Sequence, residues 1–398
     1  PSHRNQDHTL KETQPIRSQK ALLIYLVLAL YVYLLNAAGP ITRYLQDELS
    51  LSYTMRSLHT SAFAAGMVLI GMFGNLLFKR MNYWLAVAIG AVGLGSGGLL
   101  LVLARSSALS LAGLFIVGTI GTFILALYPA IIDREMRQHA ALGIAEANVL
   151  SSIFAALAPV AIGFFASKVV GWRLAVILVA GAAGLIGVYL FTRKDTFTPP
   201  LALDLAQEKH AEARLPRLYW VLWLAMILSV TVEFCTIYWG ADYLEKVRGI
   251  AHNSATQAVS LFLIGMIIGR IVSSRLLDRL GARLVLMVSI ILGLLGFLMF
   301  WAVPFPAVSI AGLLVSGLGV ASLYPTNLAL SIDASNGLKA LAGSRSTLAS
   351  GIAVLLMPLL LGVLADNLGI RPAFLIMPVA YGLLVLVLAL ARRMRAEA

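Results

Sequence analysis

Charged residues are scarce in this chain. Asp, Glu, Lys and Arg make up 12% of its 398 residues, whereas 60% are hydrophobic and the mean hydropathy is +0.89. One soluble core of this length cannot bury so much apolar surface, so the composition excludes an ordinary water-soluble protein. Cysteine is scarcer still. The single Cys235 excludes both a disulfide framework and a cysteine-based metal site.

The sequence also lacks the motifs of nucleotide, metal and hydrolase chemistry. It has no P-loop, no His/Cys/Asp cluster with metal-ligand spacing and no G-x-S-x-G elbow. His59 stands alone and is best interpreted as a packing residue. We therefore expect neither an enzyme, nor a metal site, nor a cofactor.

Long apolar runs dominate what is present. A run of about 20 residues is the length needed to cross the hydrocarbon core of a bilayer, and twelve such runs occur between Ala21 and Leu390. They lie at approximately 20–45, 54–78, 83–104, 107–132, 139–167, 172–191, 217–244, 254–278, 283–303, 307–332, 340–365 and 372–391. The sequence predicts a multi-pass, all-α membrane protein.

The basic residues are distributed unevenly between the two faces of the membrane. If the first span runs outward, 21 of the 30 Lys and Arg fall in inner segments, 8 in outer segments and Arg270 within a span. This bias places both termini in the cytoplasm and explains the net charge of +12 as topology rather than nucleic-acid binding. The polar stretch before Lys20 does not resemble a cleavable signal. We expect a bacterial inner (plasma) membrane protein.

Short repeats divide the chain into two similar halves. LYPA at 127–130 recurs as LYPT at 323–326, 196 positions later, and Pro159 with Gly163 recurs as Pro358 with Gly362, 199 positions later. Such paired matches indicate a parallel repeat about an axis along the membrane normal. The expected organisation is a cytoplasmic tail (1–19), a six-helix bundle (20–191), a polar cytoplasmic linker (192–216), a second six-helix bundle (217–391) and a short cytoplasmic tail (392–398).

The most specific motif is GRIVSSRLLDRLGAR at 269–283. Its Leu276, Asp278, Arg279, Gly281 and Arg283 resemble the loop signature of the major facilitator superfamily, in which an acid, a base and a glycine turn join two helices. The copy in the first half, at 74–82, has Phe78 where the acid belongs. The resemblance implies twelve transmembrane helices in two six-helix bundles related by a pseudo-two-fold axis. It also implies a monomeric secondary transporter whose partners are a small-molecule substrate, protons and membrane lipid.

A finer resemblance concerns the segments VEFCTIYWGADYL at 232–244 and SLFLIGMIIGR at 260–270. They are similar to spans seven and eight of fucose-permease-like sugar:proton symporters, which slightly favours a sugar-like solute. The first span has Asn36 where an acid is expected, however, and spans four and five lack the arginine and Gly-Pro signatures of drug antiporters. An exporter of amphipathic compounds and an organic-anion carrier stay open as alternatives. An intramembrane enzyme or a receptor is disfavoured because no catalytic constellation or effector domain is visible.

Two charges fall deep within spans. An ionisable side chain in hydrocarbon must be paired, face water or change its protonation state, so Glu233 is the candidate for proton coupling. A structural ion pair with a neighbouring helix is the alternative. Thr236 shares the helical face of Glu233. Arg270 could clamp an anionic substrate or hold Glu233 ionised, or it could serve helix packing alone.

Polar and aromatic side chains near the middle of other spans complete the set of candidate substrate residues. Asn36 and Arg43 share one stripe of span one, although Arg43 could also reach the outer surface. Tyr128-Pro129 and Tyr324-Pro325 could interrupt their helices and free backbone carbonyls for a ligand. The candidates for substrate binding are Asn36, Arg43, Tyr128, Thr236, Arg270, Tyr324 and Asn327.

The charged loop at the inner end of span eight suggests a gate. Its charges can bridge to the other half, and Glu146 at the start of span five is the natural partner for Arg275 or Arg279. Such a latch would hold the cytoplasmic side closed, whereas a solvated surface pair is the plain alternative. The candidate gating residues are Glu146, Arg275, Asp278, Arg279, Gly281 and Arg283.

Overall fold

The computed structural model describes residues 18–78, 81–136, 139–193, 214–336 and 338–396. Within these ranges, twelve helical segments are long and apolar enough to cross a membrane. Each corresponds to one of the runs expected from the sequence, with ends that differ by several residues. The prediction of an all-α protein with twelve spanning helices is confirmed. Residues 1–17 of the predicted tail (1–19) and residues 194–213 of the predicted linker (192–216) lie outside the described residues.

In the part of the chain that the structure describes, each half contains seven helices. The first half comprises α1 (Gln19–Leu49), α2 (Tyr53–Phe78), α3 (Tyr83–Leu103), α4 (Ser107–Ile120), α5 (Thr122–Met136), α6 (Ala140–Ala166) and α7 (Arg173–Thr192). The second comprises α8 (Arg217–Arg248), α9 (His252–Trp301), α10 (Pro306–Val320), α11 (Leu323–Asp333), α12 (Lys339–Leu368), α13 (Ile370–Ala373) and α14 (Ile376–Ala396).

Helices and spans do not correspond one to one. The pairs α4–α5, α10–α11 and α13–α14 each form one span, whereas α9 contains two. The two spans of α9 meet at Gly281, whose φ of 74° and ψ of 158° are non-helical. This positive φ suits glycine because glycine has no Cβ to clash with the backbone. The glycine turn expected from the sequence motif therefore lies at Gly281.

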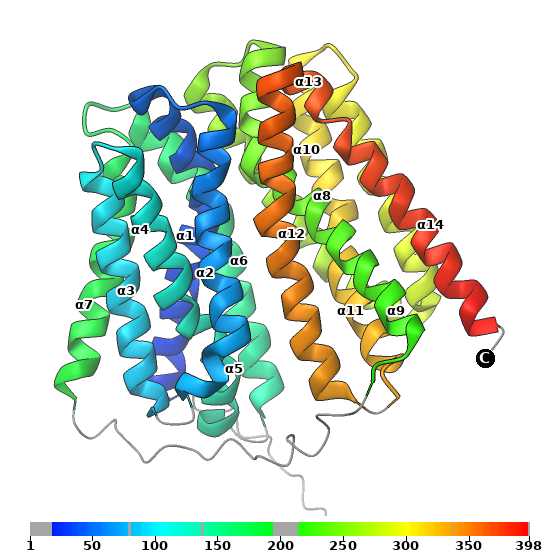
Figure 1. Ribbon diagram of the computed structural model, residues 1–398, viewed down its shortest axis with the longest axis horizontal. Coiled ribbons are helices and arrows are strands. Elements are labelled where there is room, and N and C mark those ends of the chain that lie inside the picture. Colours follow the sequence, from blue (N-terminus) through cyan, green and yellow to red (C-terminus); the bar gives the residue numbers. More distant parts are fainter. Residues whose placement is uncertain (1–17, 79–80, 137–138, 194–213, 337, 397–398) are drawn as a thin grey trace, which may run out of the picture.

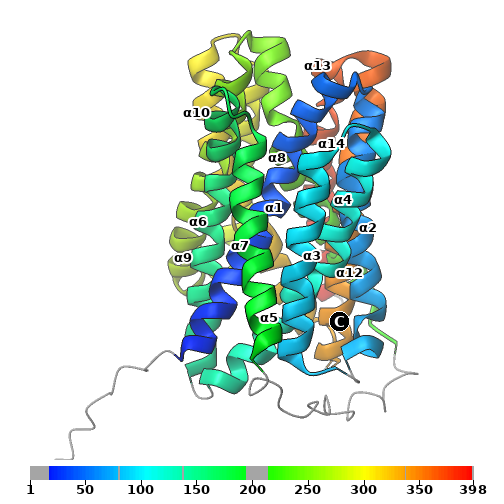
Figure 2. The same ribbon diagram turned by 90° about the vertical axis from the view of Figure 1, so that its left-hand side faces the viewer.

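The bundle has two distinguishable ends. We call the end with the start of α1 and the end of α14 the near end, and the opposite end, where α1 is followed by α2 and α8 by α9, the far end (Figures 1 and 2). Helices α1 and α8 pack on each other between the halves, and the pairs α2–α12 and α6–α9 also join them. In Figure 1, α2 and α12 run side by side at the junction.

The internal repeat is visible in the packing of glycines. A Cβ added to Gly113 would lie 2.9 Å from the carbonyl oxygen of Gly97, and one added to Gly312 would lie 2.7 Å from that of Gly296. Both residues of the second pair lie 199 positions after their counterparts. Small residues allow helix backbones to approach closely in a membrane. The same close crossing is thus built twice, at the repeat offset seen in the sequence.

Only one of the two Tyr-Pro pairs lies at a helix break. In the second half, α10 ends at Val320 and α11 begins at Leu323. The break falls where the missing N–H of Pro325 would have bonded to the carbonyl of Ala321. In the first half, the break falls at Gly121 and α5 continues through Pro129. The expectation that Tyr128-Pro129 interrupts its helix is therefore wrong.

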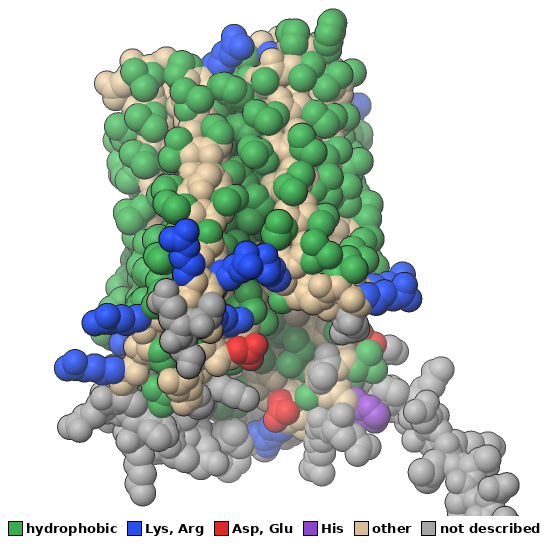
Figure 3. Space-filling model, turned by 90° about the vertical axis from the view of Figure 1, so that its right-hand side faces the viewer, with side chains coloured by type: hydrophobic (Ala, Val, Ile, Leu, Met, Phe, Trp, Pro, Cys, Tyr) green, Lys and Arg blue, Asp and Glu red, His purple; other side chains and the backbone are tan. Residues whose placement is uncertain are grey.

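The outer surface of the bundle is suited to lipid. Large apolar side chains are exposed around it, with Leu185 of α7 74% exposed and Leu386 of α14 64% exposed. On the face shown in Figure 3, hydrophobic side chains cover most of the height of the molecule, while Lys and Arg gather toward the near end. Helices that are apolar outside as well as inside require hydrocarbon as their solvent.

Candidate solute cavity and far-end cluster

A cavity lies between the two halves, bordered by α1, α6, α8 and α9, with about 190 Å³ of space for water. One water needs about 10–15 Å³ by this kind of measure, so the cavity is large enough for a small organic solute. Its polar lining residues come from all four helices. They are Asn36, Asn148, Ser151, Ser152, Glu233 and Arg270.

Glu233 and Arg270 are the charged residues among the described side chains that line this cavity. Glu233 is partly exposed and Arg270 is exposed. Among the described residues, the Glu233 carboxylate has no hydrogen bond and no ion pair within 4 Å, although Arg270 is its electrostatic neighbour. A carboxylate in this position remains available for a proton or a solute. The structural ion pair considered as the alternative role of Glu233 is not formed here.

Asn36 faces the cavity from α1, where its side-chain amide donates to the carbonyl of Val32 at 2.9 Å. Helix α6 adds a polar stripe opposite. Asn148 donates to the Ile144 carbonyl at 2.9 Å and Ser151 donates to the Ala147 carbonyl at 2.7 Å. These bonds satisfy one donor each and leave side-chain oxygens free to accept from a ligand.

The polar stripe of α6 was not among the site residues predicted from the sequence. Its signal is nevertheless present, because Asn148, Ser151 and Ser152 recur at i, i+3 and i+4 within an otherwise apolar span. On a helix this spacing places the three side chains on one face. A polar stripe inside a membrane span marks a surface that faces protein or water rather than lipid.

The other candidate substrate residues are not among the described residues that line the cavity. Thr236 is buried and donates to the Val232 carbonyl at 2.8 Å, within its own helix. Asn327 is fully buried and donates to Ser229 at 3.1 Å, while its Oδ1 has no hydrogen-bond partner among the described residues. Tyr128 and Tyr324 are partly exposed. The structure therefore brings together Asn36, Glu233 and Arg270 from the predicted set.

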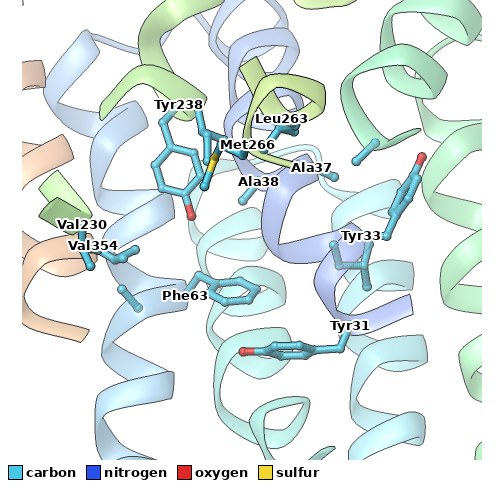
Figure 4. Close-up of a cluster of buried hydrophobic side chains, with 14 of the residues drawn as sticks. Tyr31, Tyr33, Ala37, Ala38, Phe63, Val230, Tyr238, Leu263, Met266 and Val354 are labelled. Carbon is cyan, nitrogen blue, oxygen red and sulfur yellow. The ribbon is translucent and has the colours of Figure 1, made fainter. Parts of the chain in front are cut away.

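Aromatic side chains lie between the helices near this region (Figure 4). The Tyr31 ring lies 6.1 Å from that of Phe63, and the Tyr31 hydroxyl pairs with Thr122 at 2.9 Å. Tyr238 points its hydroxyl toward Phe63 in Figure 4, and that hydroxyl is buried with no hydrogen-bond partner among the described residues. Part of the interface between the halves is thus polar and incompletely satisfied.

At the far end, charged side chains join the two halves directly. Arg56 of α2 lies 2.6 Å from Asp242 of α8, measured from Nη1 to Oδ1, and Arg43 of α1 lies 3.5 Å from the same oxygen through its Nε. Arg43 also pairs with Glu245. The side chains of Arg43, Arg56 and Asp242 are 2–3% exposed. We call Arg43, Arg56, Asp242 and Glu245 the far-end cluster.

Further hydrogen bonds fix both arginines against the second half. Arg56 donates to the Tyr238 carbonyl at 2.9 Å and covers the Trp239 ring at 4.5 Å. Arg43 donates to Thr256 at 2.7 Å. Bonds that occupy most of the donors of a buried guanidinium offset the cost of its desolvation. The far end is therefore closed by interactions that run from one half to the other.

This arrangement changes the interpretation of Arg43. The residue lies in the far-end cluster and not among the described lining residues of the cavity. The sequence gives little indication of a role for Arg56, Asp242 or Glu245, because they stand near the ends of apolar runs like ordinary interfacial residues. The one available signal is the opposite charge of Arg43 and Asp242 at equivalent repeat positions, 43 and 242.

The near end shows no comparable closure among the described side chains. Glu146 accepts a hydrogen bond from Tyr25 of its own half at 3.3 Å. Arg275 and Arg279 are exposed, and no described ion pair joins either to Glu146. The side chain of Asp278 lies outside the described residues. The latch expected from the sequence thus stays a prediction for a conformation in which the near end is closed.

Comparison with known proteins assigns the family. The sequence model of the Major Facilitator Superfamily matches residues 21–257 and again 222–398, two overlapping matches that together cover both halves. The chain belongs to the major facilitator superfamily. No curated protein sequence matches this superfamily member. The family assignment predicted from the 269–283 motif is confirmed.

Solved structures with the same fold include three kinds of transporter. A bacterial homologue of the human lysosomal transporter Spinster, in an inward-facing and occupied conformation, has a TM-score of 0.75 at 16% identity over 96% of this chain and 98% of its own. The nucleoside transporter NupG has 0.72 at 15% over 95% and 99%. The peptide transporter POT in complex with alafosfalin has 0.75 at 15% over 94% of each. At these identities the similarity shows the fold alone.

Proposed function

We propose that this superfamily member is a proton-coupled secondary transporter that moves a small organic solute by alternating access, with Glu233 as the coupling residue. The observation that carries the proposal is a carboxylate that has no partner among the described residues and lines a cavity between two repeat-related bundles. A carboxylate there must take up a proton or gain a partner when water leaves the cavity. Binding at the interface of two repeats is the arrangement that alternating access requires.

The far-end cluster and the near-end arginines together indicate to which side of the membrane the cavity opens in this conformation. The excess of Lys and Arg at the near end supports an orientation with that end in the cytoplasm of a bacterial inner membrane. The closure of the far end by the cluster supports the proposal that this conformation is inward-facing. Asn36, Asn148, Ser151 and Ser152 would hold the solute, and Arg270 would lie toward the cytoplasmic mouth.

The resemblance of spans seven and eight to sugar symporters favours a sugar-like solute, and the mix of amides, hydroxyls and apolar lining residues is compatible with it. Export of amphipathic compounds has less support because no described feature corresponds to the drug-antiporter signatures. Purified protein in liposomes tests the proposal. A pH gradient should drive solute accumulation that collapses when a protonophore removes the gradient. If no tested solute crossed the membrane under any gradient, a transport function would be ruled out.

A further inference from the structure

The charges of the cavity restrict the solute further, on the basis of the proposed function. Its described lining holds one acid, Glu233, and one base, Arg270, and the two are not joined by an ion pair within 4 Å. Both belong to the second half, on α8 and α9, whereas the uncharged polar groups face them from α1 and α6. A solute in the cavity would therefore meet both charges at once.

The resemblance of spans seven and eight favours a sugar-like solute, but a neutral sugar would not balance these charges. We propose that the transported solute is instead a small organic monoanion, typically a monocarboxylate with an apolar body, which binds Arg270 while a proton occupies Glu233. The planar guanidinium offers paired N–H donors that match a carboxylate. Opposite it, the Asn148 and Asn36 amides can bond polar substituents of the solute. The apolar body would rest on Phe234, Leu263 and Met266, which line the same cavity.

Charge balance during the conformational change is the reason for choosing a monoanion. If Glu233 is an anion and Arg270 a cation in the empty cavity, its net charge is zero. With a proton on Glu233 and a monoanion on Arg270, the net charge is again zero. A proton alone leaves one positive charge, and the anion alone leaves one negative charge. Occluding an uncompensated charge in a low-dielectric interior is costly, so these half-loaded states should not reorient.

The net charge of the occluded cavity also distinguishes the other classes of solute. A neutral solute moving with a proton leaves the unbalanced charge of Arg270 in the occluded cavity. A zwitterion balances the two side chains without any proton, so it would move uncoupled from a pH gradient. Proton coupling through Glu233 and neutrality of the occluded cavity together select a monoanion. Obligatory co-transport of one proton and one anion follows, and it moves no net charge across the membrane.

The binding test uses solutes that match in shape and differ in charge. The probes are 3-phenyllactate as the monoanion, 3-phenyllactamide as the neutral amide and phenylalanine as the zwitterion, with lactate, lactamide and alanine as a smaller set. A ligand that binds the folded state raises the midpoint of thermal unfolding. We expect a monoanion to raise it more at pH 5.5 than at pH 8, because the proton and the anion bind cooperatively.

Variants assign the effect to the two charges. Arg270→Gln should weaken monoanion binding by about 10- to 100-fold, as expected for loss of a charge-assisted hydrogen-bonded pair. Glu233→Gln should bind the monoanion equally at both pH values, because the glutamine is permanently neutral. Arg217→Gln, which removes an exposed arginine at the start of α8, is the matched control and should behave as wild type.

Liposome transport completes the test. Proton-driven uptake of the bound monoanion should be insensitive to a membrane potential set with potassium and valinomycin. Equal stabilisation by acid and amide, preference for the zwitterion, or no shift with any monoanion of the set would overturn the inference. Proton-driven uptake of a neutral solute would overturn it as well and leave the proposed function intact, so the two failures are distinguishable.

Discussion

Arg43 and Asp242 occupy equivalent positions in the two halves, 199 residues apart, and their side chains meet at 3.5 Å with exposures of 2% and 3%. Equivalent residues related by a two-fold axis can touch only if both lie beside that axis. Gly39 and Tyr238, at the same offset, are also in close contact, since a Cβ on Gly39 would lie 2.8 Å from the Tyr238 Cα. The far-end closure is therefore built around the pseudo-two-fold axis itself.

The first prediction concerns that closure. Asp242→Asn removes the carboxylate that receives both Arg56 and Arg43, leaving Arg56 buried without its anion. Breaking a buried pair in this way typically costs about 3–5 kcal/mol. The lost energy destabilises the state with the far end closed, so molecules with the far end open should increase. Distances between spin labels on α2 and α8 at the far end would measure the change.

A matched control is available for this experiment. Glu48 pairs with Arg173 at 2.5 Å, but both belong to the first half, so Glu48→Gln should leave the distances between halves unchanged. Labels can be placed on introduced cysteines because the native Cys235 is buried. Identical distance distributions for wild type and Asp242→Asn would rule out a closing role for the cluster.

The second prediction concerns proton coupling. Glu233→Gln mimics a permanently protonated side chain, so accumulation against a gradient should be lost. Exchange of labelled for unlabelled solute should survive, since exchange requires no net movement of protons. Uptake and exchange by well-folded variant protein between pH 5 and 8 provide the measurement. Accumulation equal to that of wild type, with the same pH dependence, would show that Glu233 does not couple.

The third prediction concerns the near end. If Asp278 and Glu146 help to close it in the outward-facing state, Asp278→Asn and Glu146→Gln should each increase the fraction of inward-facing molecules. The direction is opposite to that expected for Asp242→Asn. Accessibility of single cysteines introduced at the near end would report it. Both variants with wild-type accessibility would leave these residues without a latching role.

The fourth prediction tests the repeated helix crossing. Gly113→Ala and Gly312→Ala would each force a methyl group against a neighbouring backbone, at 2.9 and 2.7 Å from the carbonyl oxygens of Gly97 and Gly296. Overpacking of this kind costs about 1–3 kcal/mol. Both should lower the midpoint of thermal unfolding in detergent. Gly181→Ala, where an added Cβ meets nothing within 4 Å, is the control and should not lower it.

The fold is largely readable from the sequence because its determinants are local. Apolar runs long enough to span a bilayer located all twelve segments, and the Asp278–Gly281 motif located the turn between two of them. The helix break near Gly121 was not predictable from Pro129. A proline acts within one turn, whereas the break at Gly121 falls two turns before it, where an added Cβ would lie 2.5 Å from Leu94 of α3.

The site was only partly predictable. Glu233, Arg270 and Asn36 stand out because charged and amide groups are costly inside a membrane. Arg43 and Arg56 resemble interfacial residues in the sequence, and their burial depends on Asp242 arriving from a helix almost two hundred residues away. Their partners become evident only once the halves are placed about the axis.

The contact between Arg43 and Asp242 also distinguishes the two halves, because the same position beside the axis carries a positive charge in one half and a negative charge in the other. If two copies of the first half paired about the same axis, Arg43 would face Arg43, and two copies of the second half would oppose Asp242 to itself. Like charges in a buried contact repel strongly. The pair therefore disfavours pairing of a half-molecule with a second copy of itself. Halves produced as separate chains should assemble only as a mixed pair.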